Sequence, residues 1–230
     1  AGATELVLDR KVDTWKAGDW IVVTATDYIP NHSEMRQIES VVTSGDHTVI
    51  TLQTALSYPH NGERYDLAKH QIPARLNIDK EKEEDYMTSV DTRAAVALLT
   101  RSIRIVSEGA ALDQPFPSPE DSSTGRYFGG HVIARQGFKV FQMKGVELKD
   151  LGQGGRMAHS PINFHLARQV PTSDNSKPGT LSTYVTACSV NESMTRMYEI
   201  RGTQGVTLKG NVGYKSIGHG YFLAEGTETG

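Results

Sequence analysis

The chain has 230 residues, of which 22% are charged and 37% are hydrophobic, and its formal net charge is −3. This balance is ordinary for a soluble globular protein, and it excludes the strongly basic surface that typifies nucleic-acid-binding domains. The apolar runs are too short to cross a bilayer. We therefore expect no nucleic-acid partner and no membrane insertion of this stretch of chain.

Residues 1–60 predict a small N-terminal β subdomain, which we expect to pack on the solenoid predicted for residues 129–230 below. Short runs rich in β-branched residues are separated by turn signals such as SGDH and PHNG. The runs, in chain order, are ELVLD, WIVVTATDY, IESVV and TVITL.

Residues 61–128 change in character and predict long inserted loops. This part holds the charged run KEKEED and the proline-rich stretch ALDQPFPSPEDSSTG. Charged runs of this kind are usually solvated, and long loops without structure of their own are commonly functional. Between the two loops, residues 90–106 read as a buried strand segment, because their end, LTRSIRIV, alternates between apolar and polar residues.

Residues 129–230 predict the rungs of a parallel β-helix. The segment around CSV can be laid over the segment around GHGYF at a spacing of 22 residues, so that Val190 falls on Val212 and Ile200 on Phe222. Repeats of this length, made of β-branched runs and turn glycines, are typical of solenoids, in which each unit buries its apolar face on a neighbour. Cys188, the single cysteine, shares the alternating pattern of Val190 and is expected to be a small core residue.

The alternation of side chains along a strand divides the rungs into two faces. Phe164, Ile200 and Phe222 align and are assigned to the interior. Their neighbours then point outward, and His219 shares the face of Tyr221. With stacked rungs about 4.8 Å apart, the lateral neighbours are predicted to be Asn163–Glu199–Tyr221 and His165–Arg201. Arg156 and His159 lie in the loop that leads into the first of these rungs.

This outward-facing set suits an anionic sugar polymer. Arginine can hold a uronate carboxylate through two hydrogen bonds, an exposed tyrosine can stack on a sugar face, and a carboxylic acid can protonate a glycosidic oxygen. The predicted catalytic residues are His165, His219, Glu199 and Glu225. The predicted substrate-binding residues are Arg156, His159, Asn163, Arg201 and Tyr221.

Two alternatives stay open from the residues alone. The outward-facing groups could satisfy one another as a solvated polar row without any ligand. No cofactor is predicted with certainty, but a divalent cation such as calcium remains an alternative ligand of the histidines and carboxylates, although no tight spacing such as His-x-x-x-His supports a metal site.

Several segments resemble one known family when they are taken together in order. They are WKAGDWIVVTATDY, VDTRAAVALLTRSIRI, GVELKDLGQ, SPINFHL, TYV, CSV, RGT and GHGYFLAEG. They are similar to the fibrocystin-like proteins and the cell-migration-inducing hyaluronidase family, and WKAGDWIVVTATDY resembles the end of the glycine-named β domain of that family. The resemblance implies an all-β chain: a right-handed parallel β-helix with a small N-terminal β subdomain and long inserted loops.

The resemblance also implies a secreted or cell-surface protein that acts on acidic polysaccharides or other glycans, cleaving the glycosidic bonds of uronate-containing chains as hyaluronidases do. The alternative is a non-catalytic glycan-binding or adhesion module of a larger surface protein, because Asn163, Arg201, Ala224 and Ala95 depart from the family pattern and remove two imidazoles and two carboxylates. We expect this stretch to be part of a longer chain.

Overall fold

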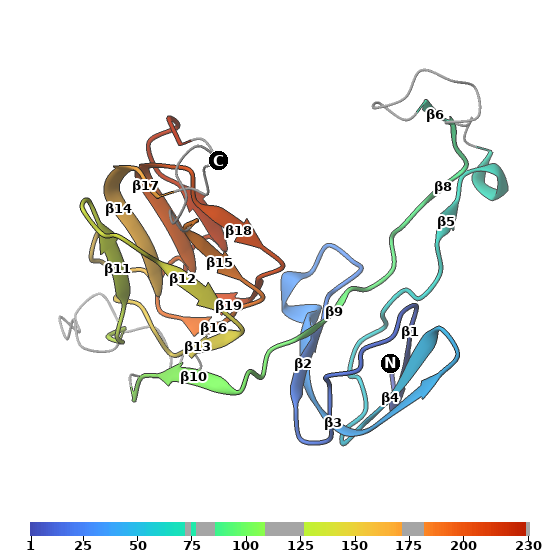
Figure 1. The fold of residues 1–230 in the computed structure, drawn as a ribbon. Coiled ribbons are helices and arrows are strands. Elements are labelled where there is room, and N and C mark those ends of the chain that lie inside the picture. The colour runs from blue at the N-terminus through green and yellow to red at the C-terminus, as the bar shows by residue number, and fades with distance from the viewer. Residues whose placement is uncertain (72–74, 77–85, 109–126, 172–181, 229–230) are drawn as a thin grey trace, which may run out of the picture. The chain divides into compact units, whose positions relative to one another are not determined.

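The computed structural model describes residues 1–71, 75–76, 86–108, 127–171 and 182–228. The chain forms two compact units, an N-terminal unit of Ala1–Ala97 and a C-terminal unit of Leu98–Gly230, and each is described here by itself (Figure 1). In the part of the chain that is described, no helix is both long enough and apolar enough to span a membrane. The charged run at 80–85 and most of the proline-rich loop lie outside the described residues.

The N-terminal unit is built on a five-stranded sheet in the order β1-β4-β3-β2-β9. The strands β1 to β4 pair in antiparallel fashion. They fall on the four β-branched runs, so the prediction that these runs form strands is confirmed. Ile21, Ile38 and Ile50 are fully buried on this sheet, as expected where β-branched side chains cover one face. The strands are β1 (Glu5–Leu8), β2 (Trp20–Val23), β3 (Glu34–Ser44), β4 (His47–Leu52) and β9 (Val96–Leu98).

Shorter elements complete this unit. Two 3-10 helices, η1 and η2, and two small antiparallel pairs, β5–β8 and β6–β7, lie between the main strands. Their bounds are η1 (Pro30–His32), β5 (Tyr65–Asp66), η2 (Ala68–His70), β6 (Arg75–Leu76), β7 (Tyr86–Met87) and β8 (Ser89–Val90).

The C-terminal unit consists of three stacked parallel sheets, which confirms the β-helical architecture. The sheet orders are β10-β13-β16-β19, β11-β14-β17-β20 and β12-β15-β18. The chain visits the three sheets in turn, so that each circuit adds one rung (Figure 1). The strands are β10 (Ile103–Val106), β11 (Val132–Arg135), β12 (Gln142–Lys144), β13 (Val146–Lys149), β14 (Ile162–Gln169), β15 (Tyr184–Thr186), β16 (Ser189–Ser193), β17 (Tyr198–Gln204), β18 (Thr207–Lys209), β19 (Val212–Ser216) and β20 (Tyr221–Leu223).

The interior of the stack is a continuous apolar core. Phe164 pairs with Ile200 across β14 and β17, as predicted, and both face inward. Cys188 is fully buried in the same core beside Val190, and burial raises the pKa of its thiol. Its role is therefore that of a small core residue, because a reactive thiol needs the opposite shift.

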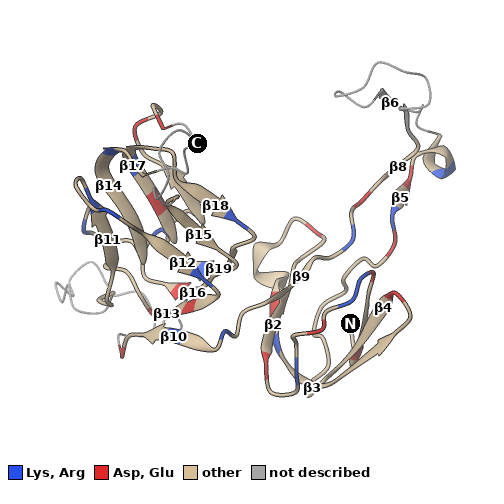
Figure 2. Ribbon diagram, in the orientation of Figure 1, with Lys and Arg blue, Asp and Glu red and all other residues tan. Residues whose placement is uncertain are grey.

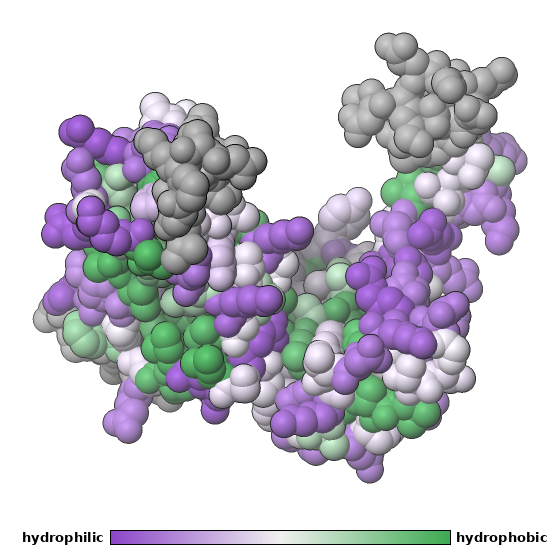
Figure 3. All heavy atoms as spheres, in the orientation of Figure 1, coloured by the Kyte–Doolittle hydropathy of each residue, from purple (hydrophilic) through white to green (hydrophobic). Residues whose placement is uncertain are grey.

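The rungs at β10 to β12 are less well covered than the middle of the stack. Side chains of Ile103, Val106, Ile133 and Val140 are exposed there. Hydrophobic surface is visible near β11 and β12 in Figure 3. The best-covered rungs are therefore those of β13–β15 and β16–β17, where the polar residues described below are found.

The last rung corrects the predicted register by one residue. Ile200 pairs with Leu223 and Glu199 pairs with Phe222, so the repeat is 23 residues (222 − 199) rather than 22. The cause is Gly213, which pairs with Val190. A Cβ on this glycine would lie 2.3 Å from the sulfur of Met197, so a methionine from the neighbouring rung fills the place of the missing side chain.

Gly129 and Gly130 offer a matched test of the packing where the chain enters β11. A Cβ on Gly129 would lie 2.3 Å from the carbonyl oxygen of Asp150, whereas one on Gly130 meets nothing within 4 Å. We expect Gly129→Ala to lower the free energy of unfolding by about 1–3 kcal/mol, because a backbone must move. Gly130→Ala should change it by about 0.5 kcal/mol or less. Equal losses in thermal or urea unfolding would contradict this packing.

Candidate functional site

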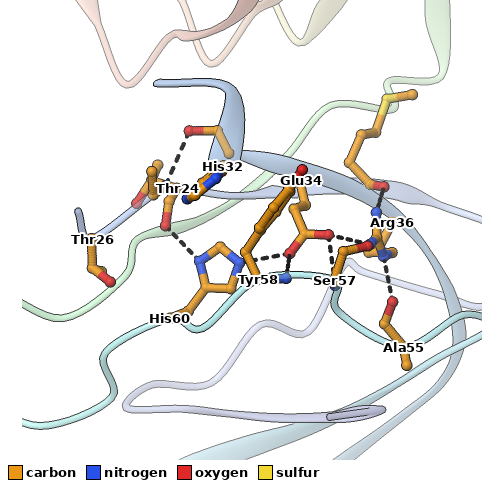
Figure 4. Close-up of polar contacts among 12 residues, drawn as sticks. Thr24, Thr26, His32, Glu34, Arg36, Ala55, Ser57, Tyr58 and His60 are labelled. Atoms are coloured by element: carbon orange, nitrogen blue, oxygen red, sulfur yellow. Dashed lines mark hydrogen bonds and ion pairs between the residues drawn. The ribbon is translucent and has the colours of Figure 1, made fainter. Parts of the chain in front are cut away.

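The N-terminal unit contains a buried carboxylate whose hydrogen bonds are all made within the protein (Figure 4). Glu34 accepts hydrogen bonds from the backbone N–H groups of Ser57 at 2.8 Å and Tyr58 at 2.9 Å, from His60 Nε2 at 2.9 Å, and from Arg36. Burial alone raises the pKa of Glu34, but these donors lower it to about 2. A buried charge that is fully paired in this way is a structural anchor.

A second buried polar cluster lies on the outer face of the sheet β11-β14-β17-β20, and it is arranged differently. In the aligned register, Asn163 is beside Glu199, and His165 is beside Arg201. We call these four residues the polar ladder. Charged residues of both signs occur along β17 (Figure 2). The prediction that these side chains face away from the core is confirmed, but Asn163 and Glu199 are only 1% exposed, so they are not solvated.

The polar ladder is not satisfied by its own surroundings. Neither amide atom of Asn163 hydrogen-bonds to any described residue, and the same holds for His165 Nδ1. Glu199 Oε1 and Arg201 Nε make no hydrogen bond to the described residues either, but they lie 3.5 Å apart as an ion pair. Buried polar atoms almost always find a partner, and each exception calls for an explanation. The three such atoms on Asn163 and His165 therefore contrast with Glu34 in the same chain, whose hydrogen-bond donors are supplied by the protein itself.

Glu199 is held between serine and arginine side chains. Ser160 Oγ donates a hydrogen bond of 2.6 Å to Glu199 Oε2. The guanidinium groups of Arg196 and Arg201 lie 3.8 Å and 3.5 Å from the two carboxylate oxygens. Both distances are those of ion pairs rather than of hydrogen bonds, so neither arginine commits an N–H group to a hydrogen bond with Glu199. Arg201 also contacts Glu225 through Nη1 at 2.5 Å.

A pocket of about 470 Å³ is lined by Arg196 and Arg201, the two arginines that contact Glu199. Three arginines, one histidine and one threonine contribute to its wall, and the other lining residues are apolar or glycine. The lining includes Arg156, Arg196, Arg201, His219, Met157, Met194 and Ile217. A pocket of this composition has a positively charged wall, which suits an anionic ligand with some apolar surface, as a sugar has.

The surroundings of His165 shift the pKa of its imidazole. Its pKa is lowered, first by burial and then by the positive charges of Arg135 and Arg201. The imidazole is therefore neutral near pH 7, because its ordinary pKa is already close to 6.5. A neutral imidazole can both donate and accept a hydrogen bond, as hydroxyl ligands require.

The remaining predicted site residues divide into those near the pocket and those away from it. Arg156 and His219 line it, and Glu225 reaches Arg201. His159 instead donates from Nδ1 to the carbonyl oxygen of Met157 at 2.6 Å, and it does not line the pocket. Arg156 Nη1 also lies 3.3 Å from Gln153 Oε1.

Tyr221 is not a neighbour of Glu199, which corrects the prediction. The one-residue shift pairs it with Tyr198, and the two rings stack at 4.9 Å. Its hydroxyl donates to the carbonyl oxygen of Asn211 at 3.2 Å. The aromatic residue beside Glu199 is Phe222.

Two residues of the site escaped the sequence reasoning. Ser160 and Arg196 both lie in turns before β14 and β17, so they belong to no alternating pattern. The only signal for Arg196 is that it precedes Glu199 by three residues, a spacing that has no meaning for strand residues. Within the described ranges, no three histidine, cysteine, aspartate or glutamate side chains gather as a metal site.

Comparison with known proteins gives a consistent result. Residues 127–230 match the family described as CEMIP beta-helix. The chain is 30% identical over 230 residues to the cell migration-inducing and hyaluronan-binding protein of Homo sapiens, covering 98% of this chain and 15% of the relative. It is also 30% identical over 221 residues to a human cell surface hyaluronidase, covering 94% of this chain and 14% of the relative.

A cell surface hyaluronidase of Danio rerio is similar at 30% identity over 234 residues. The chain spans about 15% of the length of these relatives. The matched residues contain the polar ladder and the described strands of the stacked parallel sheets from β11 onward, whereas β10 precedes them. Over residues 127–230, the chain matches the family described as CEMIP beta-helix, which is what its stacked parallel sheets are similar to.

Proposed function

We propose that this chain is part of an extracellular protein that binds an acidic, uronate-containing polysaccharide at the polar ladder. The observation that carries the proposal is the set of buried polar atoms without hydrogen-bond partners among the described residues, next to an arginine-lined pocket. The similarity to a hyaluronan-binding protein and to cell surface hyaluronidases supports the ligand class and the location.

The chemistry of the site matches such a ligand. The planar guanidinium groups of Arg156, Arg196 and Arg201 can each donate two parallel hydrogen bonds to a carboxylate. The amide of Asn163 and the neutral imidazole of His165 each combine a donor with an acceptor, which is what sugar hydroxyls need. A ligand that satisfies groups already buried pays little further desolvation.

Cleavage of the bound chain is the second candidate function. It is favoured by the relatives named as hyaluronidases and by two carboxylates, Glu199 and Glu225, that contact the same arginine. Hydrolysis of a glycosidic bond ordinarily needs two carboxyl groups, one to protonate the leaving oxygen and one to act as nucleophile or base. Glu199 and Glu225 would take these two roles.

One experiment separates the two candidates. The chain is incubated with hyaluronan, with polygalacturonate and with neutral dextran, and both retention on immobilised polymer and polymer length are measured. We expect retention on the two acidic polymers and none on dextran, with a salt dependence that reflects ionic contacts. Shortening of hyaluronan would establish cleavage. Retention on no acidic polymer would overturn the proposed function.

A further inference from the structure

The pocket beside the polar ladder contains one arginine whose environment differs from that of the other two. Arg156 hydrogen-bonds to Gln153 at 3.3 Å, and Arg201 pairs with Glu225 at 2.5 Å. The guanidinium of Arg196 makes no hydrogen bond to any residue in the described part of the chain, and its nearest carboxylate oxygen, on Glu199, is 3.8 Å away. Its donors are therefore uncommitted.

Arg196 is nevertheless held in place by the residues around it. Its guanidinium carbon lies 3.9 Å from the centre of the Phe222 ring, a distance typical of a cation–π contact. The Phe222 ring also stacks with His219, whose ring centre is 5.3 Å from that of Phe222. The guanidinium is thus oriented by an aromatic surface that leaves its N–H edges free.

The backbone around Arg196 is fixed as well. Ser193 Oγ is 3.0 Å from the carbonyl oxygens of both Thr195 and Arg196. Gly218 packs so closely that a Cβ there would lie 2.9 Å from Cγ of Arg196. The turn therefore presents the arginine with little freedom to lose on binding, and such pre-organisation is what raises the affinity of a contact.

We infer that Arg196 is the specificity-determining residue of this site, the one that receives the carboxylate of the acidic sugar. This inference rests on the proposed function, because it assigns a role within the same pocket. A stacked guanidinium with free N–H edges can form the two parallel hydrogen bonds that a planar carboxylate accepts, whereas an ammonium group cannot. The site therefore selects uronates over neutral sugars through this one side chain.

The test uses the full chain and two probes, a hyaluronan oligosaccharide and the same oligosaccharide with its carboxyl groups reduced to alcohols. Affinities are measured by isothermal titration calorimetry for the wild type, Arg196→Ala, Arg196→Lys and Lys209→Ala. Lys209, an exposed residue of β18, is the charge-matched control because it lies in another sheet and does not line the pocket.

We expect Arg196→Ala to weaken binding of the acidic oligosaccharide by about tenfold or more, the usual effect of losing a charged hydrogen-bond pair. Arg196→Lys should recover only part of this loss, and Lys209→Ala should change nothing. All four proteins should bind the carboxyl-reduced probe equally.

Three results would overturn the inference, and they can be told apart. If the wild type binds the acidic probe and Arg196→Ala binds it equally well, Arg196 does not receive the carboxylate, but the proposed function stands. If the wild type binds neither probe, the proposed function fails together with the inference. An equal loss of affinity for both probes in Arg196→Ala would also contradict selection through the carboxylate.

Discussion

Asn163→Leu is expected to stabilise the C-terminal unit and, at the same time, to weaken polysaccharide binding. Asn163 is 1% exposed and its amide makes no hydrogen bond to the described residues, so the wild-type protein carries the desolvation cost of that amide, about 1–3 kcal/mol. Leucine has the same number and branching of side-chain heavy atoms and no polar atoms. We therefore expect a gain of about 1–2 kcal/mol in the free energy of unfolding and a loss in affinity of about tenfold or more.

Thr203→Val is the matched control for this prediction. Thr203 is equally buried and lies on the neighbouring strand, but its hydroxyl accepts from the backbone N–H of Ala167 at 3.0 Å and lies 2.9 Å from the carbonyl oxygen of Arg201. Removing a satisfied hydroxyl should cost about 1–3 kcal/mol. Urea unfolding that shows the same loss for both variants would mean that Asn163 is a structural residue and that the polar ladder is no ligand site.

Glu34→Gln is expected to produce the largest loss of stability in the N-terminal unit. The pKa of Glu34 falls from its ordinary 4.5 to about 2 because His60 and the backbone N–H groups of Tyr58 and Ser57 offset the cost of burial. A difference of that size corresponds to about 3 kcal/mol of folding free energy at neutral pH. Glutamine cannot carry the charge that these donors surround, so this stabilisation is lost.

The pH dependence follows from the direction of the shift. Because the pKa of Glu34 is lower in the folded protein, its contribution is fully present above about pH 4.5 and is lost as the pH falls toward 2. The free energy of unfolding of the wild type should fall steeply as the pH is lowered through this range. The free energy of unfolding of Glu34→Gln should depend much less on pH. Asp27→Asn serves as the control, since Asp27 pairs with His32 at the surface and should affect stability far less. A similar pH profile for wild type and Glu34→Gln would refute the assignment.

The strands could be predicted from the sequence because their signal is local. β-branched runs mark β1 to β4, and apolar alternation places Phe164 and Ile200 on the inner face of adjacent rungs. These patterns depend only on which side chains suit a pleated, half-buried surface. The order of the rungs came from the repeat and from the family resemblance rather than from any single segment.

The register of the last rung could not be predicted, because the position that decides it has no side chain. Matching Ile200 with Phe222 maximised apolar identity, yet Gly213 takes an interior place that Met197 fills from a neighbouring rung. Matching apolar residues between repeats cannot detect an interior position at which the side chain of a residue from another rung fills the space. In the observed register Phe222 lies beside Glu199, and its ring is the surface on which Arg196 packs.

The candidate site was predicted in outline but not in its defining property. Alternation correctly placed Asn163, His165, Glu199 and Arg201 on one face, as neighbours in pairs. Their burial was not predictable, because even the residues that contact Glu199 from outside the strands, Ser160 and Arg196, carry no periodic signal. A polar row that is exposed to solvent is an ordinary surface, whereas a buried polar row is a candidate binding site. Tertiary packing determines which of the two forms, and the sequence pattern does not show it.

The central claim is that the buried polar atoms of the ladder serve a ligand, and the side-chain amide of Asn163 reports on it most directly. In a nitrogen–proton correlation spectrum of the labelled chain, the Asn163 amide signal is assigned by its absence in Asn163→Leu. Titration with a hyaluronan oligosaccharide is then followed at this signal. We predict a large, saturable shift, because both amide atoms gain partners on binding. A signal that stays in place while the oligosaccharide binds elsewhere would contradict the account.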